Sequence, residues 1–146
     1  KEGINSISED AVINANYLRT KLENTLDLPY NRICSHEVVF SAKTIKEKYG
    51  VNALDISKRL IDYNIHPPTM YFPLIVDEAL LVEPTETESK ETLDDFISVI
   101  KQIVDEAKTD PDLLHNAPHN TPNKRLNEAL AARNPKLSWR DTQISS

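Results

Sequence analysis

The chain has 146 residues, a formal net charge of −6 at pH 7 and one cysteine, Cys34. Its length suffices for a single domain with a buried core, its acidity disfavours a nucleic-acid partner, and one cysteine excludes an internal disulfide. Apolar runs such as 79–82 are far shorter than the roughly 20 residues of a membrane span, and the polar start lacks the apolar segment of a signal peptide. We therefore expect a cytoplasmic protein with no membrane and no nucleic-acid partner.

Glycine is scarce, with only Gly3 and Gly50 in the whole chain. Phosphate-binding loops use glycines so that the backbone can approach the ligand closely. The sequence therefore contains no P-loop and no dinucleotide fingerprint, and a phosphorylated cofactor would have to be held by another segment.

The first segment predicts a helix with apolar residues on two sides. Ser6 and Glu9 have the spacing of a capping box, whereas Ile13 and Tyr17 lie off the main apolar stripe. Helices at the start of free-standing domains are usually apolar on one side only, so we expect this helix to pack between two bodies. The stripe contains Ala11, Ala15, Leu18, Leu22 and Leu26.

The next segments predict a strand and two helices. Residues 33–41 alternate as a strand whose better core face carries Cys34, His36, Val38 and Phe40. A short helix over 44–49 ends at Gly50. Asn52 begins a second helix with Asp55 as its carboxylate partner, and its buried stripe is Ile56, Leu60 and Tyr63.

The second half predicts an edge strand, a buried strand and a long helix. Prolines bracket residues 69–72, which favours an edge strand or a stiff extended loop. Residues 79–82 form a short buried strand, and Ser89 caps a helix whose stripe runs from Leu93 to Ala107. The polar remainder, with one short helix over 124–133, cannot build a core of its own. Together these elements predict an α+β fold, a small and mainly antiparallel sheet covered by helices on one side.

A dense run of carboxylates and hydroxyls follows the second strand, at 83–89, and has two interpretations. Ser89 and Glu91 serve the start of the long helix. Glu83, Thr85 and Glu86 are better candidates for the wall of a polar site, although helix capping alone could explain the whole run. The calcium-loop spacing with its glycine is absent, and we expect no metal site.

The other candidate groups also have structural alternatives. His36 is either a core-edge histidine or a proton carrier, and His66, stiffened by Pro67, is either an exposed loop residue or a substrate contact. Tyr71 and its neighbour Phe72 are either an aromatic wall or packing residues. A Cys34–His36 nucleophile pair is formally possible, and Pro118 argues against a zinc site built on His115 and His119. No catalytic set is complete.

Several segments resemble one family. His66-Pro-Pro-Thr-Met-Tyr-Phe-Pro-Leu-Ile-Val76 and Leu81-Val-Glu-Pro-Thr-Glu-Thr-Glu-Ser89 are similar to the C-terminal region of the glycine-cleavage P-protein, the decarboxylating glycine dehydrogenase, in the form of subunit 2 of the two-subunit bacterial enzyme. Asn14–Leu18, Cys34–Glu37 and Leu54–Leu60 resemble it too. The resemblance covers most of residues 4–133, in family order.

The resemblance implies an enzyme of the aspartate-aminotransferase fold type that uses pyridoxal phosphate as its electron sink. Such an enzyme releases CO2 from glycine and passes the aminomethyl group to the lipoyl arm of H-protein, with subunit 1 as a further partner. In the family the cofactor lysine directly follows a histidine, and none of the four histidines here is followed by a lysine. We therefore expect the chain alone to be inactive and to bind no cofactor. We also expect it to expose apolar surface that favours self-association. The implied division is an interdomain connecting helix (1–28), an α+β small domain (29–108) and an extended C-terminal tail with a short helix (109–146).

Many enzymes of this fold type hold the substrate carboxylate with an arginine of the small domain, which opposes decarboxylation. The matching region here has no arginine, so we expect a neutral or acidic wall that leaves the departing carboxylate under-stabilised. Residues 69–72 could instead line a channel for the lipoyl arm. The expected wall comprises His36, His66, Thr69, Tyr71, Glu83, Thr85 and Glu86. Another pyridoxal-phosphate enzyme of this fold type and a free-standing α+β interaction or regulatory domain remain alternatives.

Overall fold

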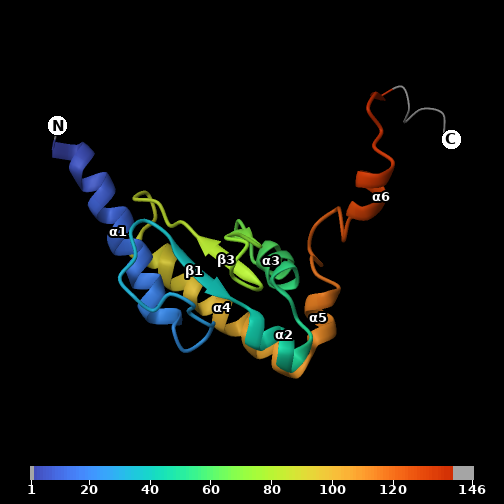
Figure 1. Cartoon of the computed structure of the whole chain (residues 1–146), viewed down its shortest axis with the longest axis horizontal. Coiled ribbons are helices and arrows are strands. Elements are labelled where there is room, and N and C mark those ends of the chain that lie inside the picture. Colours follow the sequence, from blue (N-terminus) through green and yellow to red (C-terminus); the bar gives the residue numbers. More distant parts are fainter. Residues whose placement is uncertain (1, 140–146) are drawn as a thin grey trace.

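The computed structural model describes residues 2–139 (Figure 1). Three strands form one sheet and six helices surround it or extend from it. Within this part of the chain no helix is both long and apolar enough to span a membrane. The elements are α1 (Glu2–Leu22), β1 (Val38–Ser41), α2 (Lys43–Tyr49), α3 (Ala53–Asp62), β2 (Thr69–Met70), β3 (Ala79–Val82), α4 (Lys90–Thr109), α5 (Pro111–His115) and α6 (Glu128–Arg133).

The sheet is antiparallel throughout, with β3 in the centre and the order β1-β3-β2. Phe40 pairs with Leu80, and Leu80 pairs with Met70, so these three side chains share one face. That inner face joins the buried residues of α1, α3 and α4 in a single cluster, which contains Leu18 and Ile100. The expected α+β fold with helices on one side of an antiparallel sheet is confirmed.

Three local predictions are confirmed because they depend on short-range backbone chemistry. Gly50 ends α2 with φ 77°, a left-handed conformation that a residue with a Cβ adopts only under strain. Asn52 and Asp55 form a complete capping box: the Asn52 side chain accepts from Asp55 N at 2.9 Å and Asp55 Oδ2 accepts from Asn52 N at 3.0 Å. Ser89 accepts from Thr92 N at the start of α4.

The predicted start of α1 is wrong. The helix already begins at Glu2, and the Ser6 hydroxyl donates to the Gly3 carbonyl at 2.9 Å instead of capping. α1 also ends at Leu22, but the turn that follows keeps Leu26 buried through a bond from Leu26 N to Leu22 O. Its first turns extend away from the sheet, and α6 extends from the other end of the domain (Figure 1).

The predicted strand over 33–41 is wrong in its first half, because β1 begins at Val38. The Asn16 side chain occupies both backbone groups of Cys34, accepting from its N–H at 3.1 Å and donating to its carbonyl at 2.8 Å. On the neighbouring strand, β3 ends at Val82, and Pro84 just beyond it has no N–H to donate to a strand pair. His36 therefore does not share the core face of Phe40, and it lies exposed.

The C-terminal part contains more structure than the polar sequence predicts. Residues 111–115 form α5, which has no apolar periodicity of its own but buries Leu114 completely, and Ala117 beyond it is buried as well. The predicted helix over 124–133 starts later, at Glu128, where the Asn127 side chain caps it. β2 is confirmed as an edge strand, although it contains only Thr69 and Met70.

Candidate functional site

Polar side chains gather where β3 ends beside the start of β1. Val38 is the partner of Val82, so the residues just outside this pair, Glu37 and Glu83, come side by side. Nε2 of His36 lies 3.9 Å from Oε1 of Glu83, which is an ion-pair distance when the imidazole is protonated. We call His36, Glu37 and Glu83 the acidic corner.

The acidic corner is open to solvent and rich in acceptors. Each of its three side chains offers one ligand atom, and these atoms all lie within 4.8 Å of one another. Among the ion pairs of residues 2–139, none brings an arginine or a lysine to Glu37 or Glu83. The corner can therefore attract a cation, and it disfavours an anionic group placed against it.

The loop after β3 continues the corner. Thr85 is exposed and Glu86 is half-buried. The hydroxyls of Thr85 and Thr87 lie 2.7 Å apart, and Glu88 N donates to the Thr85 carbonyl at 3.2 Å, which closes a tight turn. Ser89 faces α4 as its cap, so its predicted role at the helix start is confirmed. The predicted role of Glu83, Thr85 and Glu86 in the wall of a polar site stays a prediction.

The remaining predicted wall residues do not all join this corner. Thr69, on the edge strand β2, pairs with Leu81, and His66, three residues earlier, lies exposed toward the corner's end of the sheet. Tyr71 lies at the opposite end, where its N–H donates to the Ala79 carbonyl at 2.9 Å. The seven predicted residues therefore divide between two ends of the sheet.

Tyr71 is close to the start of α3. Its backbone has φ 58°, and burial together with the nearby Glu78 carboxylate raises the pKa of its phenol. Glu78 accepts from Ala53 N at 2.9 Å and pairs with Lys46. The neighbouring Phe72 is more than half exposed (56%), so this aromatic pair covers little of the domain's own core.

A larger hollow, of about 1080 Å³, lies away from every predicted wall residue. It is bounded by the loop 23–31, by α2, by the second half of α4 and by residues 75–77. Its basic and acidic groups pair with each other, as in Lys43–Asp77 (3.1 Å) and Lys108–Asp105 (2.6 Å). This mixed lining indicates no preference for a ligand of either charge.

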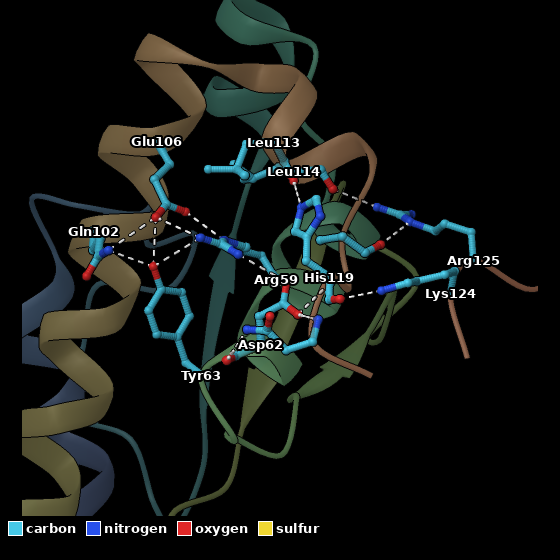
Figure 2. A network of polar contacts seen from close by, with 12 residues as sticks. Arg59, Asp62, Tyr63, Gln102, Glu106, Leu113, Leu114, His119, Lys124 and Arg125 are labelled. Atoms are coloured by element: carbon cyan, nitrogen blue, oxygen red, sulfur yellow. Dashed lines mark hydrogen bonds and ion pairs between the residues drawn. The ribbon is translucent and has the colours of Figure 1, made fainter. Parts of the chain in front are cut away.

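A polar network, which the sequence patterns did not reveal, links α3 with α4 (Figure 2). Arg59 donates to Glu106 through Nε (2.9 Å) and Nη2 (3.1 Å), and to Asp62 through Nη1 (3.1 Å). The Tyr63 hydroxyl donates to Glu106 at 2.7 Å, and Gln102 approaches the same group. The sequence spacing places Arg59, Asp62 and Tyr63 on one face of a helix. Glu106, the partner that Arg59 and Tyr63 share, is however 47 residues from Arg59 in the sequence.

Asp62 and Asp55 fasten the segment after α4 onto α3. Oδ1 of Asp62 accepts from the backbone N–H groups of His119 (2.5 Å) and Asn120 (2.7 Å). The Asp55 carboxylate accepts from Arg125 Nη2 at 2.7 Å and lies 3.2 Å from Nδ1 of His115. We call residues 111–125 the strap. His115 and His119 thus have separate partners, since His115 lies beside Asp55 and Nε2 of His119 lies 2.7 Å from the Leu113 carbonyl oxygen.

The network makes the domain sensitive to acid. Burial opposes ionisation of Glu106 and Asp62, but hydrogen bonds outweigh it and hold both pKa values below their ordinary 4.5 and 3.8. A lowered folded-state pKa contributes stability that is present above the ordinary pKa and is lost as pH falls through the folded-state value. We expect the free energy of unfolding to decline below about pH 5. Urea titrations at several pH values measure this decline, and Glu106→Gln should flatten it; an equally steep decline in that variant would contradict the assignment.

The described residues do not fit a pyridoxal-phosphate site. The backbone N–H groups at the start of α3 already donate to the side chains of Glu78 and Asn52. At the start of α4, a backbone N–H group already donates to the Ser89 hydroxyl. The carboxylates of the acidic corner would repel a phosphate. No step of a reaction is therefore assigned to such a cofactor within this chain.

The fold and its acidic corner define a class: an α+β domain with one covered sheet face and a polar site at the sheet's end. A family model described as "Glycine dehydrogenase, C-terminal domain" matches residues 7–123. The chain therefore belongs to the glycine dehydrogenase C-terminal domain family.

Three curated relatives of this chain carry one and the same protein name. "Probable glycine dehydrogenase (decarboxylating) subunit 2" of Thermotoga maritima is 54% identical over 140 residues, which is 96% of this chain and 30% of that protein. The proteins of the same name from Shouchella clausii and Pyrococcus horikoshii are 55% and 50% identical, over 94% and 96% of this chain and 28% of theirs. The chain thus spans less than a third of the relatives it matches.

Proposed function

We propose that this chain is the C-terminal part of subunit 2 of a glycine decarboxylase of the glycine cleavage system. That enzyme releases CO2 from glycine and transfers the aminomethyl group to the lipoyl arm of H-protein. The observation that carries the proposal is the match of nearly the whole chain to proteins named for this activity, together with the C-terminal domain model that matches residues 7–123. Pyridoxal phosphate, subunit 1 and a cytoplasmic location belong to the same proposal.

The chain's own part in this reaction is one wall of the site. We assign it to the acidic corner together with Thr85 and Glu86, because these two residues follow Glu83 closely in the loop after β3. A wall without a cation leaves the substrate carboxylate poorly stabilised in the ground state. Since CO2 is neutral, that destabilisation is relieved in the transition state and speeds decarboxylation.

Thr69 and Thr85 test whether this wall takes part in the reaction. In the full-length two-subunit enzyme, Thr85→Ala should slow the exchange of the glycine carboxyl with labelled bicarbonate by about tenfold, as expected for a lost polar contact to the reacting group. Thr69→Ala, on the edge strand β2, should have a smaller effect. Unchanged exchange in both variants would remove this wall from the reaction.

The end of the sheet that carries Tyr71 and Phe72 allows a second role, because these aromatic residues are exposed beside Leu74. An apolar surface of this kind suits the aliphatic lipoyl arm. Phe72→Ser should then weaken the capture of H-protein while the bicarbonate exchange stays intact. Loss of both activities would instead indicate a general structural defect.

A further inference from the structure

Two asparagines of α1 contact the two segments that form the proposed wall. The segment before β1 carries His36 and Glu37, and the loop after β3 carries Thr85 and Glu86. These segments are about fifty residues apart in sequence, and the ladder that joins their strands ends at the Val38–Val82 pair. Beyond this pair, the sheet no longer sets their distance from each other.

Asn14 holds the loop after β3. Its side-chain Nδ2 donates to the Thr85 carbonyl at 2.9 Å and lies 3.3 Å from the Glu88 carbonyl. The Thr85 carbonyl also accepts from Glu88 N, so both ends of the tight turn are joined to one amide group on α1. The orientation of the Thr85 hydroxyl therefore depends on a residue 71 positions away.

Asn16 holds the segment before β1 in the same way. Its Nδ2 donates to the Cys34 carbonyl at 2.8 Å and its Oδ1 accepts from Cys34 N at 3.1 Å. This pair of bonds takes the place of ladder bonds and ends the strand early. His36 lies two residues beyond the clamped position, so its direction toward Glu83 depends on the clamp.

The spacing of the two asparagines suits this arrangement. Residues two apart on a helix point in very different directions, so one helix can reach a separate segment with each of them. α1 also packs on α4 and on β1, and Asn14 and Asn16 are half-buried rather than free in solvent. α1 therefore acts as a rigid spacer between the two segments.

We propose that Asn14 and Asn16 are positioning residues that set the distance between the acidic corner and Thr85. Neither touches substrate. This inference rests on the proposed function, since it concerns the geometry of the wall assigned there. A misplaced polar group of this kind can cost much of its catalytic effect.

The test uses isosteric variants in the full-length two-subunit enzyme. Asn14→Asp removes the donor to Thr85 without changing the side chain's size, and Asn16→Asp removes the donor to Cys34 while keeping the acceptor. Each should lower kcat for bicarbonate exchange about tenfold. Asn5→Asp, on the exposed first part of α1, is the matched control and should behave as wild type.

A combined variant separates positioning from a merely structural role. If Asn14 acts through Thr85, then Asn14→Asp combined with Thr85→Ala should be no slower than Thr85→Ala alone. Full multiplication of the two effects would overturn the inference. If Asn14→Asp does not fold, Asn14→Gln, which keeps the donor on a longer stem, replaces it, and should lose less activity than Asn14→Ala.

The outcomes distinguish this inference from the function on which it rests. A Thr85→Ala enzyme with normal exchange rejects the proposed wall, whatever Asn14 does. A slowed Thr85→Ala enzyme beside a normal Asn14→Asp enzyme rejects the positioning role alone. Hydrogen exchange on the folded chain gives a readout apart from activity: the Glu88 amide should exchange several-fold faster in Asn14→Asp, and an unchanged rate would contradict the clamp.

Discussion

Asp55→Ala should lower the free energy of unfolding of this chain by about 4 kcal/mol. The side chain is only 5% exposed and has three kinds of partner. It completes the capping box of α3 through Asn52 N, it pairs with Arg125, and it lies beside His115. Removal leaves the Asn52 N–H without its acceptor and takes the carboxylate from the Arg125 guanidinium, which keeps the Leu114 and Ala117 carbonyls. The loss of two partners at once costs more than the average contact.

Urea denaturation measures this loss, with Asp112→Ala as the control because that carboxylate is exposed on α5. The control should change stability by less than about 0.5 kcal/mol. Faster hydrogen exchange in residues 111–125 and at the start of α3 would accompany the Asp55 effect, since the strap loses its anchor and α3 loses half of its capping box. A loss below about 1 kcal/mol would mean that the strap contributes little to the fold.

Glu106→Ala should destabilise the domain by about 2 kcal/mol. Its carboxylate accepts from Arg59 and Tyr63, and the Arg59 and Glu106 side chains are 13% and 15% exposed. The hydrogen bonds to Glu106 are the main reason that the pKa of Arg59 is raised. Arg59 keeps Asp62 as a partner, so the cost is smaller than for a fully isolated buried charge.

A double variant tests whether the cost comes from the stranded charge. Arg59→Met combined with Glu106→Leu replaces both ions with apolar groups of similar size, which is often close to neutral for a buried pair. The double variant should therefore be more stable than Glu106→Ala. Equal or greater destabilisation would show that the pair stabilises the α3–α4 contact by more than it costs to bury.

The parts of the fold that sequence predicted are those encoded over a few neighbouring residues. Gly50, the Asn52–Asp55 box and the Ser89 cap each depend on backbone groups within four positions. The apolar stripe of α4 and the buried strand 79–82 follow from period alone. These signals sufficed for the α+β class and for the antiparallel sheet.

The errors have a common cause, because a distant side chain decides the local structure. Asn16 ends β1 early by binding both backbone groups of Cys34, which no pattern in 33–41 reveals. α5 is stabilised by what its side chains bury and by the strap's bonds to Asp62, not by its own composition. Neither the end of β1 nor the formation of α5 can therefore be predicted until the contacts of the tertiary fold are known.

The candidate site was predictable in its residue types but not in its grouping. The expected wall placed Tyr71 together with Glu83, whereas the antiparallel pairing of β2 with β3 puts them at opposite ends of the sheet. Glu37, which the expected wall omitted, joins His36 and Glu83 through the register of β1 with β3. Strand register, which short strands specify weakly, decides these neighbours.

The most direct test of the acidic wall is a charge reversal at Glu83 in the full-length enzyme. Glu83→Arg would place a cation where the wall has a carboxylate, with Asp112→Arg as the control for net charge. We predict that KM for glycine falls while kcat for carboxyl exchange drops about tenfold or more, because the cation stabilises the substrate carboxylate that must be lost. Unchanged KM and kcat in Glu83→Arg would contradict the account.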